Sequence, residues 1–379
     1  MGLIYLDNSA TTKPCQSAIN AMQTAMCEVW GNPSSLHRLG LQAENIVSDV
    51  RGKIADLINC REDEIIFTGS GTEANNLCLI GIAEAQKRRG NKIVTTSVEH
   101  PSVLNTCKYL SENGYEVTYI KPDSNGHISA DDVLNAVDDK TILVSVMLVN
   151  NETGCIFPVS EIAEGLKDRK SRALLHSDCV QAFGKTDIDV DDLGVDLLTA
   201  SGHKIHGPKG IGFLYKKKNI TIMPIIHGGN QEKGLRSGTE SVPLIAAFGG
   251  ALDELSIVSS LSSVKKVHAY AVEKLSAMDG VVINSPLKNY LPYIINISVL
   301  GYRSETLLHF LEARDIFVSS GSACSKGKGS HVLNEMGLNA DIIDSALRIS
   351  FSKNTTTDDI DALCSALADA QNTLRRKGH

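Results

Sequence analysis

The sequence lacks the features that would place the protein in a membrane or on a nucleic acid. Its 379 residues contain no apolar run of about 18 residues, so we expect no segment to cross a bilayer. The first residues show no basic stretch followed by an apolar run, and Leu6 stands where a myristoylation motif has Ser or Thr. The formal net charge is −7 and no long basic block occurs. We therefore expect no direct contact with a membrane or with nucleic acid.

The cysteine pattern excludes further kinds of site. Nine cysteines are present, but no two form a Cys-x-x-Cys pair, so neither a zinc ribbon nor a thioredoxin motif is indicated and no metal is expected. An odd number of cysteines in a chain of this size is typical of free thiols in a reducing compartment rather than of a disulfide scaffold. We therefore expect a cytoplasmic protein.

The composition is that of an ordinary globular protein, with 42% hydrophobic and 21% charged residues. The chain is long enough for roughly two or three domains. From about residue 45 to 215, short apolar runs alternate with amphipathic, helix-like stretches. This alternation predicts an α/β fold with a mainly parallel sheet covered by helices on both faces, which binds ligands at the carboxyl ends of its strands. The expected strands are residues 65–68, 92–96, 116–120, 142–150, 173–177, 197–200 and 210–215, and the expected helices are residues 73–89, 101–113, 130–137 and 159–169.

The pattern changes after about residue 250. It is typical of a smaller α+β domain. We assign residues 15–255 to the large domain, and residues 1–14 with 256–379 to the small one, which carries Cys324. The expected elements of the small domain are a long helix at 256–278, an apolar run at 293–300, a helix at 305–313, strands at 316–318 and 346–351, and a terminal helix at 357–375.

Two short segments suggest covalent chemistry. Residues 201–204, Ser-Gly-His-Lys, place Lys204 directly after the apolar run 195–200. A lysine in a half-buried pocket loses proton affinity and can form a Schiff base with an aldehyde cofactor. Residues 320–324, Ser-Gly-Ser-Ala-Cys, place Cys324 on a loop of small residues, where a thiol is free to attack. A solvated surface lysine and a buried, structural cysteine are the alternative interpretations.

A phosphate site is suggested where the expected strand 65–68 meets the following helix. Small residues, among them Gly71 and Thr72, open that helix. Backbone N–H groups and the Thr72 hydroxyl could hold a phosphate at the positive end of the helix, although a plain strand–turn–helix has the same pattern. The polar, glycine-rich stretch 228–239 is long enough to form a second loop that contacts phosphate.

Further polar side chains follow other expected strands. Asp178 could pair with a protonated pyridine nitrogen, and Gln181 could donate to a ring oxygen. His100 could stack on an aromatic ring and shuttle protons. Each has a simpler interpretation: Asp178 as a helix cap, and His100 as a surface or satisfied core residue.

Two more residues suggest where a substrate would bind. Arg348 lies within a strand-like apolar run, so it needs a partner, which is either a substrate carboxylate or a structural ion pair. Asn151 follows another expected strand, where simple turn chemistry would also explain it. Each of these signals is weak alone. A purely structural explanation is difficult for all of them together, because one sheet would carry at its strand ends a lysine, an acid, a histidine, an amide, phosphate donors and an arginine.

With these motifs the sequence resembles the cysteine desulfurases of the NifS/IscS type, within the class V aminotransferase-like, fold-type I enzymes that use pyridoxal 5'-phosphate. The resemblance covers nearly the whole chain. It implies a large domain with a mainly parallel, seven-stranded sheet and a smaller α+β domain at the C-terminus. The matching segments are residues 5–12 (Tyr-Leu-Asp-Asn-Ser-Ala-Thr-Thr), 31–37, 71–76, 99–100, 150–154, 176–181, 201–210, 236–239 and 320–324.

The resemblance implies roles at the cofactor ring. Lys204 would hold the cofactor as a Schiff base and move the substrate proton. Asp178 would pair with the ring nitrogen, and Gln181 with the ring hydroxyl. His100 would stack on the ring and take part in catalysis, with Asn151 close to both cofactor and substrate.

It also implies the groups that bind the phosphate and the substrate. Arg348 would hold the substrate carboxylate, with Asn32 nearby, and Cys324 would be the nucleophile that takes the sulfur. The protein would be a homodimer, because one phosphate ligand comes from the neighbouring subunit. The phosphate ligands would be Gly71, Thr72, Ser201 and His203, with Thr239 from the neighbour.

The implied reaction converts L-cysteine to L-alanine and leaves the sulfur on Cys324 as a persulfide, for a protein acceptor in iron–sulfur cluster assembly or tRNA thiolation. A selenocysteine lyase or another class V enzyme is the alternative, and a cofactor-free sulfur carrier is a third, against which Lys204 and Asp178 argue. The sequence departs from the family at Asn230, Cys179 and His206, and the segment after the nucleophile is short and basic. These departures leave the acceptor open.

Overall fold

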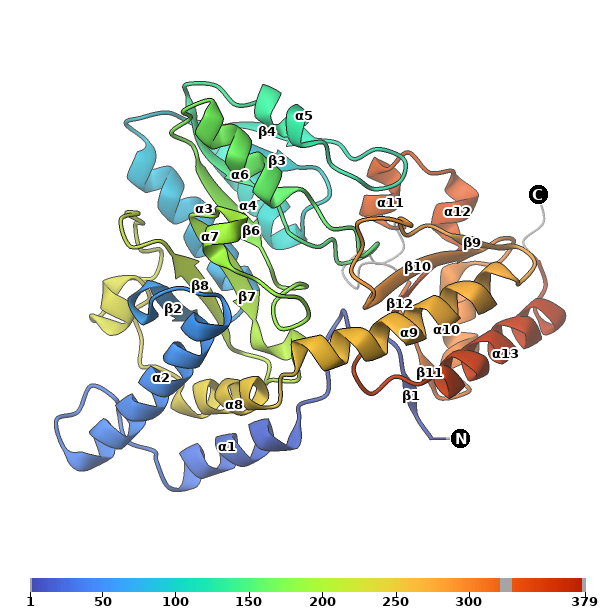
Figure 1. Ribbon diagram of the computed structural model, residues 1–379, viewed down its shortest axis with the longest axis horizontal. Coiled ribbons are helices and arrows are strands. Elements are labelled where there is room, and N and C mark those ends of the chain that lie inside the picture. Colours follow the sequence, from blue (N-terminus) through green and yellow to red (C-terminus); the bar gives the residue numbers. More distant parts are fainter. Residues whose placement is uncertain (1, 321–328, 377–379) are drawn as a thin grey trace.

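The computed structural model describes residues 2–320 and 329–376, and its centre is a seven-stranded sheet (Figure 1). The strand order is β2-β8-β7-β6-β5-β3-β4. All neighbours pair in parallel except β8, which runs antiparallel to both β2 and β7. The strands are β2 (Ile65–Thr68), β3 (Lys92–Thr96), β4 (Glu116–Ile120), β5 (Thr141–Ser145), β6 (Leu174–Asp178), β7 (Leu197–Ser201) and β8 (Gly212–Lys216).

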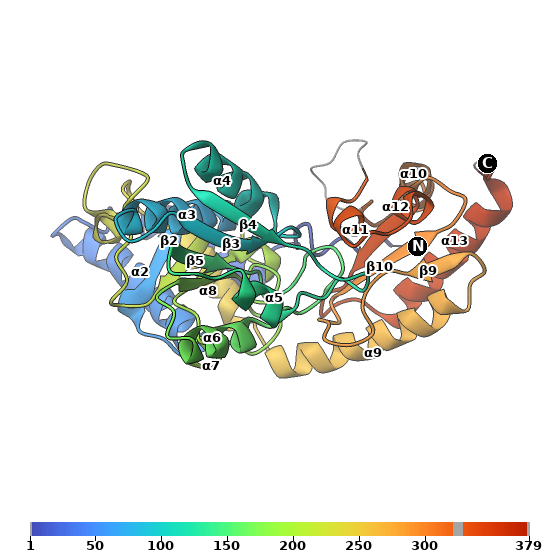
Figure 2. The same cartoon turned by 90° about the horizontal axis from the view of Figure 1, so that it is seen from above.

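Helices cover both faces of this sheet, because consecutive side chains of a strand point to opposite faces. Ile93 and Leu143 pack with α3 and α4, whereas Val94 and Val144 pack on the other face in the larger core cluster. Figure 2 shows α3 and α4 on one side of the strands, with α6, α7 and α8 on the other. The helices of this part are α1 (Gln16–Cys27), α2 (Arg38–Leu57), α3 (Gly71–Gln86), α4 (Pro101–Glu112), α5 (Ala130–Asn135), α6 (Val159–Asp168), α7 (Val190–Leu193) and α8 (Val242–Asp253), with short 3-10 turns at Glu62–Glu64, Gly202–Lys204 and Gln231–Gly234.

A second, smaller layer of strands lies beside the large sheet (Figure 1). Three antiparallel strands have the order β12-β10-β9, and β1 pairs in parallel with β11. The long helix α9 runs along this part. Its elements are α9 (Ile257–Ser276), β9 (Val281–Ile283), β10 (Ile294–Val299), α10 (Ser304–Glu312), β11 (Ile316–Phe317), α11 (His331–Glu335), α12 (Ala340–Asp344), β12 (Ala346–Ser350) and α13 (Thr357–Thr373), with β1 at Ile4–Tyr5.

The N-terminal segment connects the two groups of strands. β1 pairs with β11, and Asp7 then forms a parallel bridge with Ser350 at the end of β12. A few residues further on, the Thr12 amide donates at 3.0 Å to the carbonyl oxygen of His203, and His203 lies just beyond β7. Residues 5–12 therefore pass between the large sheet and the small one.

The predicted fold class is confirmed, and the strands β2, β3 and β4 begin and end where the sequence predicts. β5 is shorter than the predicted 142–150, because the chain turns back after it: the Asn150 amide donates to the Cys155 carbonyl, and Gly154 takes a positive φ of 75°. α8 was not predicted, because it is apolar on nearly all sides and lacks an amphipathic period. The division of domains at residues 14/15 and 255/256 stays a prediction.

In residues 2–320 and 329–376, no single helix is long and apolar enough to cross a bilayer. α8 and α9 pass a test of length and composition as a pair, although the chain bends by 71° between them.

Replacement of Phe248 tests the core beneath the large sheet. Its ring lies 6.1 Å from that of Phe183 and 6.3 Å from that of Phe213, between centroids, and it is fully buried. We expect Phe248→Ala to lower the free energy of unfolding by about 3–5 kcal/mol, because it removes the buried ring and leaves a cavity. Chemical denaturation followed by circular dichroism measures this.

Val258→Ala is the control, since Val258 on α9 is 78% exposed. A change within about 0.5 kcal/mol is expected there. Equal losses in the two variants would contradict the position of Phe248 in the core.

Candidate active site

A cavity of about 270 Å³ lies at the carboxyl ends of the strands of the large sheet. Most of the predicted site residues line it, although they come from segments far apart in the sequence. Because the carboxyl ends of neighbouring parallel strands meet at one edge, the loops that follow them converge there. The predicted residues that line the cavity are Gly71, Thr72, His100, Asn151, Asp178, Gln181, Ser201, His203, Lys204 and Arg348.

Lys204 ends the 3-10 turn that follows β7 and reaches the N-terminal segment. Its Nζ donates to the carbonyl oxygens of Ser9 at 2.6 Å and Ala10 at 2.8 Å. Burial lowers the pKa of Lys204 to about 8, and the nearby Arg348 guanidinium acts in the same direction. A neutral amine is the nucleophilic form, so Lys204 is prepared to react with an aldehyde near neutral pH.

Gln181 lies beside Lys204 and has a fixed orientation. Its Nε2 donates to the Ser9 carbonyl at 3.0 Å, and its Oε1 accepts from the Nζ of Lys185 at 3.1 Å. Lys185 is itself buried, and burial lowers its pKa to about 7. The sequence analysis missed Lys185, because nothing in its pattern distinguishes it from a surface lysine.

The end of the cavity at the start of α3 is shaped for an anion. A Cβ atom on Gly71 would lie 2.8 Å from Cγ2 of Val180, so only glycine allows this close approach. Thr72 and Ser201 bring hydroxyl groups to the same cavity, and the first N–H groups of α3 form its positive end. Burial lowers the pKa of His203 to about 3, which leaves it a neutral hydrogen-bonding group.

The carboxylate of Glu73 also lies in the first turn of α3, where an ion pair with Arg236 balances its charge. Its Oε1 accepts from Nε of Arg236 at 2.8 Å, and its Oε2 accepts from the Gly69 amide at 2.9 Å. The glycine-rich stretch that contains Arg236 therefore contacts the predicted phosphate site through this ion pair. The donor set at this end of the cavity fits a phosphate group.

Asp178 ends β6 with its side chain almost wholly buried. One oxygen accepts from the Val180 amide at 3.0 Å, and the other accepts from Nδ2 of Asn75 at 2.8 Å. His100 caps α4, since its Nδ1 accepts from the Ser102 amide at 3.1 Å, and burial lowers its pKa. The simpler interpretation of His100, as a satisfied residue, therefore holds for one ring nitrogen, while the ring lines the cavity.

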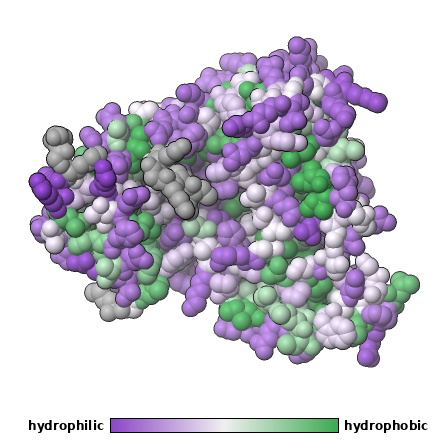
Figure 3. Space-filling model, turned by 180° about the vertical axis from the view of Figure 1, so that it is seen from behind, coloured by the Kyte–Doolittle hydropathy of each residue, from purple (hydrophilic) through white to green (hydrophobic). Residues whose placement is uncertain are grey.

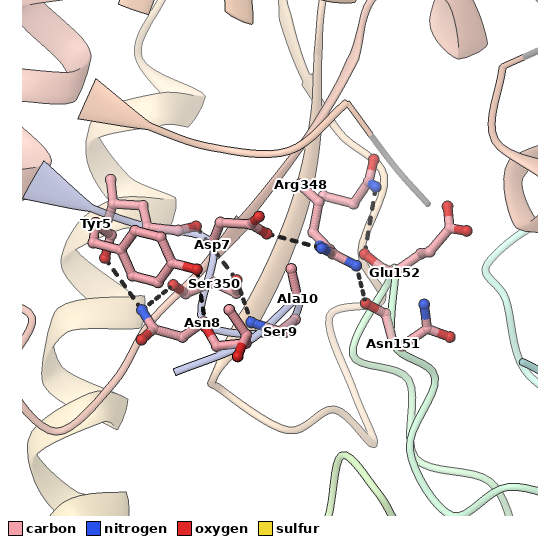
Figure 4. A network of polar contacts seen from close by, with 12 residues as sticks. Tyr5, Asp7, Asn8, Ser9, Ala10, Asn151, Glu152, Arg348 and Ser350 are labelled. Carbon is pink, nitrogen blue, oxygen red and sulfur yellow. Dashed lines mark hydrogen bonds and ion pairs between the residues drawn. The ribbon is translucent and has the colours of Figure 1, made fainter. Parts of the chain in front are cut away.

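Arg348 on β12 brings a cation from the small sheet to the same cavity (Figure 4). Its Nη2 donates to Oδ1 of Asp7 at 2.8 Å, and its Nη1 donates to the Asn151 carbonyl at 3.1 Å. Its Nε is buried and has no hydrogen-bond partner among the described residues. The predicted structural ion pair exists, and a guanidinium N–H is still available for a carboxylate.

Three predicted site residues are not brought to this cavity by the described chain. Cys324 lies outside the described residues. Its flanks are attached near the cavity: Ser319 pairs with Arg348 through backbone hydrogen bonds of 2.7 and 3.1 Å, and the Ser330 hydroxyl donates to Glu152. Asn32 and Thr239 are exposed and do not line the cavity.

The structure also brings in buried groups that the sequence analysis did not single out. Glu99 is the clearest, because its Oε1 accepts from the Met147 amide at 2.9 Å and from Thr96, and burial raises its pKa to about 8. Asn75 lies in the segment 71–76 that carries the resemblance, so its place in the motif was a usable signal. Within the described ranges, no group of three or more His, Cys, Asp or Glu side chains is arranged to hold a metal ion.

Comparison with known proteins gives consistent results over nearly the whole chain. The aminotransferase class-V family model matches residues 4–363. Cysteine desulfurase IscS of Methanosarcina thermophila is 39% identical over 376 residues, covering 98% of this chain and 93% of that protein. Putative cysteine desulfurase IscS 1 of Bacillus subtilis is 41% identical over 379 residues, covering 97% of this chain and 98% of that protein.

Solved structures of similar proteins have the same fold as this chain. A NifS-like protein has a TM-score of 0.93 and 35% identity, covering 98% of this chain and all of that one. SspA in complex with cysteine has a TM-score of 0.83 and 34% identity, covering 93% of this chain and all of that one.

The lowered pKa of Lys204 predicts how its reactivity depends on pH. An amine with a pKa of about 8 is half neutral at that pH, whereas an ordinary lysine, near 10.4, is then almost fully charged. We expect reductive trapping of the cofactor-free protein with a small aldehyde to label Lys204 with a midpoint near pH 8. Peptide mass spectrometry across a pH series measures it, and a midpoint above pH 10 would contradict the burial of this amine.

Proposed function

Because the chain belongs to the class-V aminotransferases, and among them to the cysteine desulfurases of the IscS/NifS type, we propose that it uses pyridoxal 5'-phosphate to convert L-cysteine to L-alanine and transfers the sulfur to Cys324. The activity is that of a cysteine desulfurase, and the relatives favour it over a selenocysteine lyase or a transaminase. The observation that carries the proposal is the convergence of Lys204, Asp178 and Arg348 on one cavity.

The residues present fit the cofactor. When bound, pyridoxal phosphate supplies an electron sink for the carbon skeleton of an amino acid. Lys204 would hold it through the amine, Asp178 would face the ring nitrogen, and Gln181 with Asn151 would face the ring oxygen. His100 would lie on the ring. The phosphate would be held by Gly71, Thr72, Ser201 and His203, and by Thr239 from a partner subunit.

The substrate would be oriented by Arg348. Its free Nε–H and the adjacent Nη can form two hydrogen bonds with a carboxylate. Asp7 and the Asn151 carbonyl hold the guanidinium plane, so it does not have to be ordered when the substrate binds. Lys204 would then take the Cα proton, because its lowered pKa makes a neutral amine available near pH 8.

The Cys324 thiolate would attack the sulfur of the substrate. A sulfur–sulfur bond forms, the carbon–sulfur bond breaks, and its electron pair stays on the carbon fragment, which takes up a proton to become alanine. One L-cysteine and one enzyme thiol thus give one L-alanine and one persulfide. We further propose that a protein acceptor in iron–sulfur cluster assembly or tRNA thiolation receives this sulfur, and that the protein works in the reducing cytoplasm, as its many free thiols suggest.

We also propose a homodimer. Met26, Trp30, Leu36 and Leu41, at the α1–α2 end of the molecule, are all more than half exposed, which is unusual for large apolar side chains. Figure 3 shows hydrophobic side chains gathered over the lower end, on the side of α1 and α2. A second copy would cover them, and Thr239, which is exposed and outside its own cavity, could then reach the partner's phosphate site.

Two variants test the reaction. Lys204→Ala is expected to abolish alanine formation from cysteine, because within residues 2–320 and 329–376 no other amine lines the cavity. Cys324→Ser is expected to keep the visible absorbance of the bound cofactor but to stop sulfur transfer, since a hydroxyl stays protonated at neutral pH and attacks sulfur poorly. Alanine assays and mass spectrometry after a brief cysteine pulse measure both.

Cys27→Ser is the matched control, because Cys27 is exposed on α1 and lies away from the cavity. It should behave as the wild type. If the added sulfur maps to Cys155 or Cys179, or if Cys324→Ser releases sulfide at the wild-type rate, the proposed nucleophile is wrong.

The dimer is tested by light scattering. The wild type is expected at twice the mass of one chain, and Leu36→Glu is expected to shift the protein toward the monomer and to lower its cofactor content, because Thr239 of the partner is lost. Val258→Glu places the same charge on an exposed position of α9 and should leave the dimer intact. A fully active wild-type monomer would refute the proposal.

A further inference from the structure

Asn75 is a buried side chain for which the proposed reaction has no role. It lies in the second turn of α3 and is 1% exposed. Its Nδ2 donates to Oδ2 of Asp178 and to Oγ of Ser102, both at 2.8 Å. Its Oδ1 accepts from the Thr199 hydroxyl at 2.6 Å. All these distances are typical of good hydrogen bonds, so the amide is held on three sides.

This arrangement allows one orientation of the amide. A flipped Asn75 would turn its oxygen toward the Asp178 carboxylate, and two acceptors would then face each other in a buried site. With the observed orientation, each N–H has its own acceptor. The Thr199 hydroxyl, whose hydrogen goes to Asn75, in turn accepts from Nε2 of His176. Nδ1 of His176 then accepts from the Ser145 hydroxyl at 2.9 Å.

The support therefore comes from three central strands, because Ser145 lies on β5, His176 on β6 and Thr199 on β7, and all three are fully buried. Burial also lowers the pKa of His176 to about 4, so this ring is neutral at physiological pH. Asn75 is thus anchored to the buried centre of the sheet.

The other branch of the network sets the proton on His100. The Ser102 hydroxyl accepts from Asn75 and lies 2.7 Å from Nδ1 of His100; its hydrogen points to Nδ1, because the backbone amide of Ser102 already requires that nitrogen to accept. The Ser102 amide donates to the same nitrogen at 3.1 Å. With two donors directed at it, Nδ1 carries no proton, and a neutral His100 must carry its proton on Nε2.

We infer that Asn75 is a positioning residue that uses one amide to orient two groups of the site: it fixes the Asp178 carboxylate, and through Ser102 it holds His100 in the tautomer with its proton on Nε2. The inference rests on the proposed function. Its chemical consequence is that His100 offers an N–H donor to the cavity rather than a free lone pair. His100 can then give a proton or a hydrogen bond to the substrate, while Lys204 is left to act as the base.

The tautomer can be observed directly by NMR. In wild-type protein labelled with nitrogen-15 in histidine, two-bond proton–nitrogen spectra distinguish a proton on Nε2 from one on Nδ1, and His100→Gln identifies the signal. We expect the Nε2–H form in the wild type. Asn75→Ala is expected to shift the signal toward a mixture with the Nδ1–H form, because the Ser102 hydroxyl is no longer oriented by the Asn75 N–H and can turn to accept from the ring.

Kinetics give the second readout. We expect Asn75→Ala to lower kcat for alanine formation by about 10–100-fold, the range seen when a group that orients a functional side chain is removed, with a much smaller change in KM for cysteine. Asn76→Ala is the matched control, because the next amide on the same helix contacts Thr72 O and Thr106 instead. It should keep the wild-type tautomer and rate.

Failure of this inference can be distinguished from failure of the proposed function. A wild-type His100 with its proton on Nδ1, or Asn75→Ala with the rate and tautomer of Asn76→Ala, would overturn the inference even if the enzyme makes alanine. Absence of alanine from the wild type would instead refute the proposed function. If Asn75→Ala does not fold, Ser102→Ala removes only the connecting hydroxyl; a loss of rate with a shifted His100 signal supports the inference, and unchanged values overturn it.

Discussion

The site depends on the N-terminal segment that passes between the two sheets. Within four residues it supplies Asp7 to the Arg348 guanidinium, and the carbonyl oxygens of Ser9 and Ala10 to the Lys204 amine. The Ser9 carbonyl also accepts from Gln181. Arg348 belongs to the small sheet and Lys204 follows the large one. This short segment therefore sets the distance between the group that would bind the carboxylate and the group that would move the proton.

Charge and burial explain why that geometry is reactive. The amines of Lys185 and Lys204 and the Arg348 guanidinium lie near one another, and the carboxylates of Asp7 and Asp178 balance only part of their charge. Burial keeps His100, His176 and His203 neutral and lowers the pKa values of both lysines. The remaining positive charge suits an anionic ligand, such as a phosphate or a carboxylate. A protonated Glu99, whose pKa burial raises to about 8, adds no opposing charge at neutral pH.

Much of the fold could be predicted because it follows from local patterns. The apolar runs at β2, β3 and β4 are bounded by turn residues, and their limits agree with the structure. The prediction fails where an apolar run continues through a turn: β5 ends at Ser145, and the apolar residues beyond it turn back so that Val149 and Asn150 pair with Ile156 and Cys155. Asp178, His100 and Arg348 were recognised as candidates. His100 and Arg348 also have the structural contacts that the simpler interpretations predicted, whereas Asp178 caps a turn and not a helix, because the next helix begins only at Val190.

The sequence by itself determined the alternating α/β pattern, the family resemblance and the residue types of the site, because these depend on neighbouring residues and on motifs. The tertiary structure alone decided which atoms meet. Asn75 lies within a motif segment, but no local pattern shows what its amide contacts, and Lys185 has no distinctive pattern at all. Their contacts arise only because folding buries them against Asp178 and Gln181. The same holds for the reactivity of Lys204: its pKa falls because a segment nearly two hundred residues away in sequence encloses it, and burial is a property of the fold, not of the local sequence.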